Sequence, residues 1–154
     1  MKINYIIKKV MSLSLLLVIG ICSSFTNAEM VSAGKKAPST SSYVNLSNGS
    51  YTTDDTTMIY KVFTNVCFTG TTKMKVSVSS VSVENPNGMR NTTDFYCYLY
   101  NTSTKKATKY KLSEYGGDVF YYTNMNASTK YYIYFVKTDD TKEYTFTATM
   151  SDAS

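Results

Sequence analysis

The chain contains no histidine and no tryptophan among its 154 residues. Without histidine, Ser-His and Cys-His nucleophile pairs and histidine-based metal centres are unavailable. A glycosidase that uses two carboxylates needs no histidine, but nearly all of the acidic residues fall in expected turns. We therefore expect that the protein is not an enzyme. The lack of tryptophan also makes sugar binding a weaker expectation than an aromatic-rich chain would otherwise justify.

The N-terminal segment has the features of a secretory signal peptide. A basic start, MKINYIIKK, precedes an apolar run from Val10 to Cys22, and small and polar residues lead to Ala28. This pattern predicts a signal peptide over residues 1–28, and Ala33 offers a second cleavage point. The alternative is a retained membrane anchor, for which the run is short of the roughly 18 to 20 residues that a spanning helix needs.

Cleavage after Ala28 would leave 126 residues, 154 minus 28, which is enough for one domain with a hydrophobic core. Residues 29–42 are polar and small, so we expect a flexible lead-in, followed by a single domain over residues 43–154. Loss of Lys2, Lys8 and Lys9 lowers the net charge from +5 to +2. The remaining lysines form no dense basic stripe, so nucleic acid is not an expected partner.

Helical periodicity is missing after the signal peptide, and short alternating segments separated by turn residues take its place. The pattern predicts an all-β protein, a single antiparallel β-sandwich of jelly-roll type with about eight strands. Residues 73–83 change parity midway, which predicts a β-bulge at Ser79-Ser80. Residues 130–150 are expected to form a hairpin across Asp139-Asp140, with six inward residues in three cross-strand pairs: Phe135 with Tyr144, Ile133 with Phe146, and Tyr131 with Ala148.

Two cysteines, Cys67 and Cys97, lie outside the signal peptide. In an exported protein a disulfide is the default for such a pair, and closing this loop would stabilise the fold by roughly 3 to 4 kcal/mol. Cys97 alternates with Phe95 and Leu99, which places the expected disulfide in the core. The alternatives are two free buried thiols, or a metal site that would need carboxylates or a second chain as further ligands.

Tyrosine is unusually frequent, with 15 residues in the whole chain. Five of them alternate with apolar residues on two expected strands and so should share the outward face of a sheet: Tyr96, Tyr98, Tyr100, Tyr132 and Tyr134. An exposed aromatic strip suits stacking on sugar rings or docking of a protein. The alternative is that these residues serve strand propensity and cross-strand pairing alone.

Acidic residues in the expected turns offer oxygen ligands of the kind that calcium prefers. The candidates for a weak calcium site are Asp54, Asp55, Asp94, Asp118, Asp139 and Asp140. No contiguous Asp-x-Asp-x-Asp loop is present, and solvated turn acids are the alternative interpretation. We therefore expect no cofactor, with calcium kept as a weak alternative.

Several segments resemble the small jelly-roll domain of the bacterial pre-peptidase C-terminal family. The segment with Asp94, Phe95, Cys97, Leu99, Tyr100 and Asn101 matches the family's Asp-hydrophobic-x-hydrophobic-x-Leu-Tyr-Asn/Asp pattern. Residues 120–125, 127–129, 131–135 and 144–147 match its later strands and turn. The resemblance implies an extracellular accessory module that is stabilised by calcium in some members and able to bind polymers.

Taken together, these features lead us to expect a secreted or cell-surface protein without catalytic activity. The first hypothesis is a binding or accessory module whose tyrosine-lined face contacts a cell-surface polysaccharide or protein. The alternative is a purely structural extracellular domain without a ligand site. In either case the membrane is contacted only through the signal peptide before cleavage.

Overall fold

The computed structural model describes residues 34–79, 81–84, 94–138 and 142–154. The expected signal peptide, the first residues of the lead-in and the Asp139-Asp140 turn lie outside the described residues. Within the described ranges, no helix is long and apolar enough to cross a membrane. The helical structure there is one short 3-10 turn, η1 (Leu46–Asn48).

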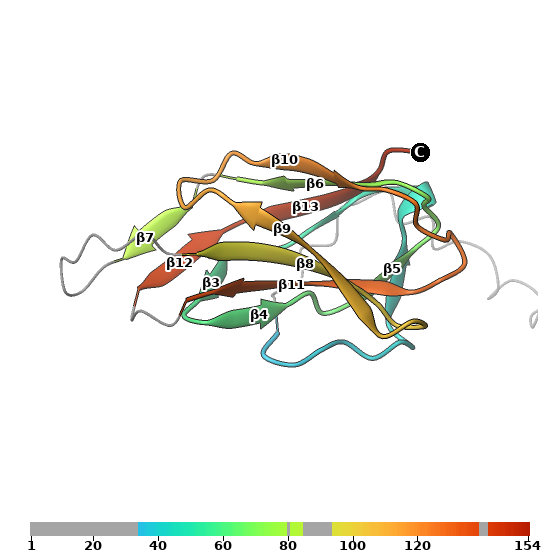
Figure 1. Cartoon of the computed structure of the whole chain (residues 1–154), viewed down its shortest axis with the longest axis horizontal. Helices are drawn as coiled ribbons and strands as arrows, with labels where there is room; N and C mark the ends of the chain where they lie inside the picture. Colours follow the sequence, from blue (N-terminus) through green and yellow to red (C-terminus); the bar gives the residue numbers. More distant parts are fainter. Residues whose placement is uncertain (1–33, 80, 85–93, 139–141) are drawn as a thin grey trace, which may run out of the picture.

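The described residues are organised as strands that form the two layers of a β-sandwich (Figure 1). The strands are β1 (Tyr43–Asn45), β2 (Tyr51–Thr52), β3 (Thr56–Met58), β4 (Lys61–Phe63), β5 (Cys67–Thr69), β6 (Met74–Val78), β7 (Ser82–Glu84), β8 (Phe95–Asn101), β9 (Lys106–Leu112), β10 (Val119–Tyr122), β11 (Tyr131–Lys137), β12 (Glu143–Phe146) and β13 (Ala148–Asp152). The first sheet has the order β1-β5-β11-β8-β9, and β4 also pairs with β11. The second layer contains β10-β6-β13-β2 and β3-β12-β7.

The two groups of strands in the second layer, β10-β6-β13-β2 and β3-β12-β7, join end to end, and a β-bulge lies where one group meets the other. Ala148 pairs with Val78, and Thr145 pairs with Ser82. A step of three residues on one strand, from 145 to 148, therefore matches a step of four on its neighbour, from 78 to 82. One extra residue therefore lies between β6 and β7, which confirms the predicted bulge in this stretch, although Ser80 itself is outside the described residues. The neighbouring strand on the other side of β12 and β13 also has one extra residue, because Thr149 pairs with Thr52 and Phe146 pairs with Thr56.

Joining β2 with β3, β4 with β5, β6 with β7 and β12 with β13 gives the strand order of a jelly roll. The second sheet then reads β10, β6/β7, β12/β13, β2/β3, and the first reads β4/β5, β11, β8, β9. Apart from the β8–β9 hairpin, each of these strands is followed by one in the opposite sheet. The expected antiparallel jelly-roll sandwich is therefore present, with β1 added to β5 as a parallel edge strand.

The expected hairpin over residues 130–150 is wrong in its pairing and correct in its faces. Strand β11 pairs with β8, β4 and β5, whereas β12 and β13 belong to the opposite sheet. All six residues assigned to the inward face are nevertheless buried. Phe135 and Phe146 meet across the core with ring centroids 4.8 Å apart. Alternation identifies which face of a strand is apolar, but it does not identify the neighbouring strand.

Aromatic rings fill the space between the two sheets. Phe95 on β8 contacts Phe135 on β11, and it also contacts Tyr144 and Phe146 on β12, with centroid distances between 5.3 and 6.3 Å. All four side chains are at most 2% exposed. Farther along the sandwich, the Tyr122 hydroxyl on β10 donates a hydrogen bond of 2.9 Å to the Cys97 carbonyl oxygen on β8. These contacts tie the first sheet to the second.

The expected disulfide is absent, because Cys67 and Cys97 are free and lie on opposite faces of the first sheet. Cys97 pairs with Phe135 and belongs to the core. Phe68 is also in the core, so its neighbour Cys67 lies on the other face of the sheet, where it is also buried and its Sγ donates to the Ser39 carbonyl oxygen at 3.8 Å. Strand β11 separates the two cysteine strands, which places the Cα atoms at least about 10 Å apart, beyond the roughly 7 Å that a disulfide spans.

Thiol labelling tests this arrangement. We expect both cysteines to be alkylated after non-reducing denaturation, as measured by peptide mass spectrometry. In the native protein at pH 8, Cys97 should resist the reagent, because complete burial raises its pKa to about 12. A peptide pair linked through Cys67 and Cys97 before reduction would contradict the structure.

Candidate binding face

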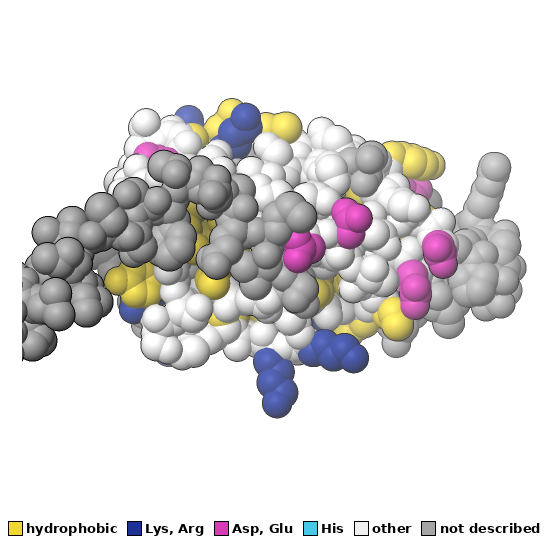
Figure 2. All heavy atoms as spheres, turned by 180° about the vertical axis from the view of Figure 1, so that it is seen from behind, with side chains coloured by type: hydrophobic (Ala, Val, Ile, Leu, Met, Phe, Trp, Pro, Cys, Tyr) yellow, Lys and Arg dark blue, Asp and Glu magenta, His cyan; other side chains and the backbone are white. Residues whose placement is uncertain are grey.

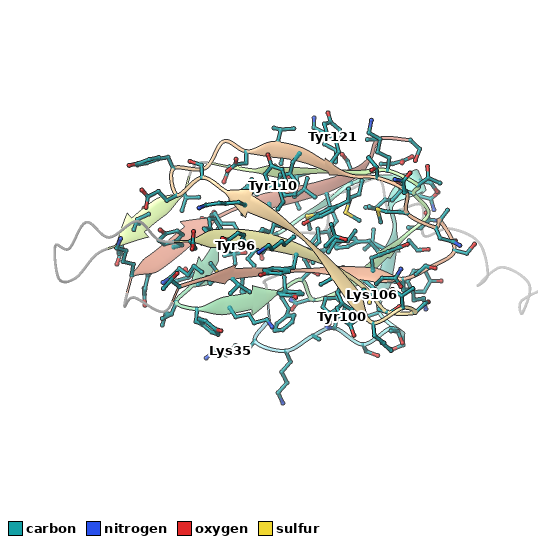
Figure 3. All side chains as sticks on the ribbon, in the orientation of Figure 1. Lys35, Tyr96, Tyr100, Lys106, Tyr110 and Tyr121 are labelled. Carbon is teal, nitrogen blue, oxygen red and sulfur yellow. The ribbon has the colours of Figure 1, made fainter. Side chains whose placement is uncertain are left out.

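The five expected tyrosines lie together on the outward face of the first sheet. Tyr96, Tyr98 and Tyr100 alternate along β8 with the buried residues Phe95, Cys97 and Leu99. On β11, Tyr132 is directly opposite Tyr100, and Tyr134 is directly opposite Tyr98. Figure 3 labels Tyr96 and Tyr100, which lie toward opposite ends of β8. We call these five residues, together with Phe63, the tyrosine face.

The tyrosine rings stack in pairs across the two central strands. Tyr98 and Tyr134 have centroids 4.7 Å apart and planes within 4°, and Tyr100 and Tyr132 have centroids 4.8 Å apart at 24°. These separations equal the spacing of about 4.8 Å between neighbouring strands, so the rings stand upright on the sheet. One broad face of each ring therefore lies against its partner, and the ring edges and hydroxyl groups point away from the sheet.

Strand β4 contributes two residues that the sequence did not assign to this face. Phe63 pairs with Tyr134, and its ring lies 5.5 Å from that of Tyr134 and 6.1 Å from that of Tyr132. The Lys61 Nζ atom lies 4.6 Å from the Phe63 centroid and 4.4 Å from the Tyr134 centroid. Alternation marked Phe63 as a strand residue, but only the pairing of β4 with β11 places it beside the tyrosines.

Strand β9 places two lysines on the opposite side of the tyrosine face. Lys109 is opposite Tyr98, and its Nζ lies 4.9 Å from the Tyr96 centroid. Lys111 is opposite Tyr96 and forms an exposed ion pair of 2.8 Å with Asp94. The hydrogen bond and charge of Lys111 lower the pKa of Asp94, which therefore stays ionised at neutral pH. The face is thus bordered by ammonium groups on both sides.

The hydroxyl groups of Tyr132 and Tyr134 are neutral at physiological pH. Burial, followed by the neighbouring Tyr100, raises the pKa of Tyr132. Burial, followed by the neighbouring Tyr98, raises the pKa of Tyr134. Each neutral hydroxyl both donates and accepts a hydrogen bond, so the face can offer either function to a ligand.

The structure does not bring the calcium candidates together. The Asp55 carboxylate accepts a hydrogen bond from Thr147, Asp118 accepts one from the Ser113 amide, and Asp94 pairs with Lys111. Across the described ranges, no group of three acidic or cysteine side chains could hold a metal ion. Asp139 and Asp140 lie outside these ranges.

Comparisons of the chain with protein-family models, with curated proteins and with solved structures give no match.

A double-mutant cycle tests the stacked arrangement. We expect Tyr98→Ala and Tyr134→Ala to show a coupling of about 0.5–1.5 kcal/mol in the free energy of unfolding, measured with urea, because each variant removes the same ring pair. Tyr96→Ala and Tyr132→Ala form the control pair, since these residues lie in different rows of the face. A control coupling as large as that of the stacked pair would contradict the geometry.

Proposed function

We propose that this protein is a secreted, non-catalytic binding module that contacts a cell-surface glycan or protein through the tyrosine face. One observation carries this proposal: six aromatic side chains form a continuous outward surface on a sheet whose other face already supplies the core. Tyrosine suits such a surface, because it combines a large apolar ring with a polar hydroxyl.

The ring geometry supports one mode of binding over another. Flat stacking on a sugar ring needs an open aromatic face, whereas each ring of the two stacked pairs has one face closed by its partner. Ammonium groups also lie over Tyr134 and Tyr96. The ring edges and hydroxyl groups are what a ligand meets first. We therefore propose hydrogen bonding and edge contact as the mode of recognition, in place of stacking on sugar rings.

The alternative, a purely structural domain, also rests on a specific observation. Stacked cross-strand tyrosines stabilise a sheet by themselves, and two such pairs join β8 to β11. In that case the face would hold the sheet together without a ligand. The two proposals differ in what the loss of a ring should do.

The extracellular setting belongs to the same proposal. The N-terminal pattern favours export, and the sequence resemblance to pre-peptidase C-terminal domains implies an extracellular accessory module. Domains of this architecture carry many unrelated functions, so the fold alone does not identify the ligand.

Retention on cell-wall preparations and on a polysaccharide panel tests the proposal. We expect Tyr98→Ala and Tyr100→Ala to lower retention by about tenfold or more, because each removes a ring from the centre of the face. Tyr121→Ala is the matched control, since Tyr121 is 49% exposed on a strand of the other sheet. Each assay is repeated with a chelator, because sensitivity to it would implicate the turn acids.

Two results would contradict the binding proposal. Equal losses for Tyr121→Ala and Tyr98→Ala would show that retention does not depend on the tyrosine face. Retention on no material, combined with a lowered melting temperature for Tyr98→Ala, would favour the structural alternative.

A further inference from the structure

We infer that the ligand of the tyrosine face is an acidic polysaccharide, held by Lys61 and Lys109. This inference rests on the proposed binding function and adds the chemistry of the ligand. Three features support it: the positive charge beside the face, the small size of the face, and backbone amides that are already paired with neighbouring strands. Each feature disfavours a different class of ligand.

The tyrosine face is bordered by three lysines, and a carboxylate neutralises one of them. Lys61 and Lys109 hold their ammonium groups over aromatic rings at 4.4 and 4.9 Å, and neither forms a salt bridge with a carboxylate within the described part of the chain. Asp94, the acid that borders the face, is paired with Lys111. A lysine held over a ring keeps its charge and still has N–H groups to offer, so these two positions suit carboxylate, sulfate or phosphate groups.

Within the described ranges, the other acidic residues belong to other parts of the fold, with Glu114 in the connection between β9 and β10; Asp139 and Asp140 lie outside these ranges. Glu84 and Glu143 are opposite each other on β7 and β12, and Asp152 is on β13, all in the second layer. Asp54 and Asp55 lie between β2 and β3, and Asp118 lies in the β9–β10 connection. Seen from behind, the molecule shows a few separated carboxylates, with basic side chains toward its upper and lower edges (Figure 2). The asymmetry favours an anionic ligand on the first sheet.

The size of the face favours a single linear chain over a folded protein. The tyrosine face and the lysines beside it extend across four strands, β4, β11, β8 and β9, and across three rows of residues. At about 4.8 Å between strands and about 3.3 Å per residue, this corresponds to roughly 14 by 13 Å. A stable protein interface covers about 800 Å² on each partner, several times this area.

The backbone and the rings disfavour the other linear polyanions. The amides of β8 and β11 are already paired on both sides, so an acidic peptide on this face gains no strand pairing. A single-stranded nucleic acid binds by stacking its bases on open ring faces, and each paired tyrosine already has one face closed by its partner. An acidic sugar chain brings hydroxyl groups and charges along its length, which match the tyrosine hydroxyls and the two lysines.

Binding to matched polymers tests the inference with the full chain. The probes are polygalacturonate and hyaluronate, with fully methyl-esterified polygalacturonate as the neutral control, and poly-glutamate and single-stranded DNA as the other polyanions. We expect binding to at least one acidic polysaccharide that weakens as salt is raised, and no comparable binding to the ester, because salt screens exposed charges. Lys61→Gln with Lys109→Gln should weaken that binding by about fivefold or more.

Lys73→Gln with Lys75→Gln is the matched control, because it removes the same charge from the second sheet. Lys73 also lies over a tyrosine ring, 4.7 Å from the Tyr121 centroid, so the control removes a similar cation–π contact. We expect this variant to bind like the wild type. Melting temperatures of both double variants show whether each remains folded.

The possible results separate the inference from the proposal on which it rests. Equal binding to the methyl ester would overturn the acidic ligand and leave the binding function in place. Equal or tighter binding to poly-glutamate or DNA would overturn the polysaccharide, and an equal loss in the Lys73/Lys75 variant would overturn the assigned site. Retention on neither acidic polysaccharide would overturn the inference, and failure of the cell-wall assay as well would overturn the proposed function.

Discussion

The packing of aromatic rings between the two sheets is the contact on which the rest of the structure depends. Phe95, Phe135, Tyr144 and Phe146 come from strands of both layers and exclude water between them. Because burial of such rings is the largest favourable contribution available to a domain of this size, the sheets are held together without a disulfide. The outward positions of β8 and β11 are then left for a surface role.

The second sheet adapts to this core by bending at one residue. Thr147 separates β12 from β13, and each neighbouring strand has one extra residue beside it. The Ser79 amide donates to the Thr147 carbonyl oxygen, and the Thr147 amide donates to the Ser79 hydroxyl, so the bulged position keeps its hydrogen bonds. Bulges increase the local twist, which lets long strands follow a closed sandwich without exposing the core.

Tyrosine has two roles that depend only on the face on which it lies. Tyr144 and Tyr122 point inward and join the sheets, whereas Tyr98 and Tyr134 point outward and stack on each other. Lysine shows a similar division. Lys61 and Lys109 cover rings at the surface, whereas Lys137 is 1% exposed and donates from Nζ to the Thr138 carbonyl oxygen. A lysine on the core side of β11 is a feature that composition does not predict.

The sequence alone determined the all-β class, the inward and outward faces of β8, β11 and β12, and the five members of the tyrosine face, because alternation is a local property of each strand. The tertiary structure decided which strands are neighbours. It placed β11 between β4 and β8 and not beside β12, separated Cys67 from Cys97, and brought Phe63 and Lys61 to the tyrosines. These outcomes depend on contacts between segments far apart in the chain, and local periodicity carries no information about such partners.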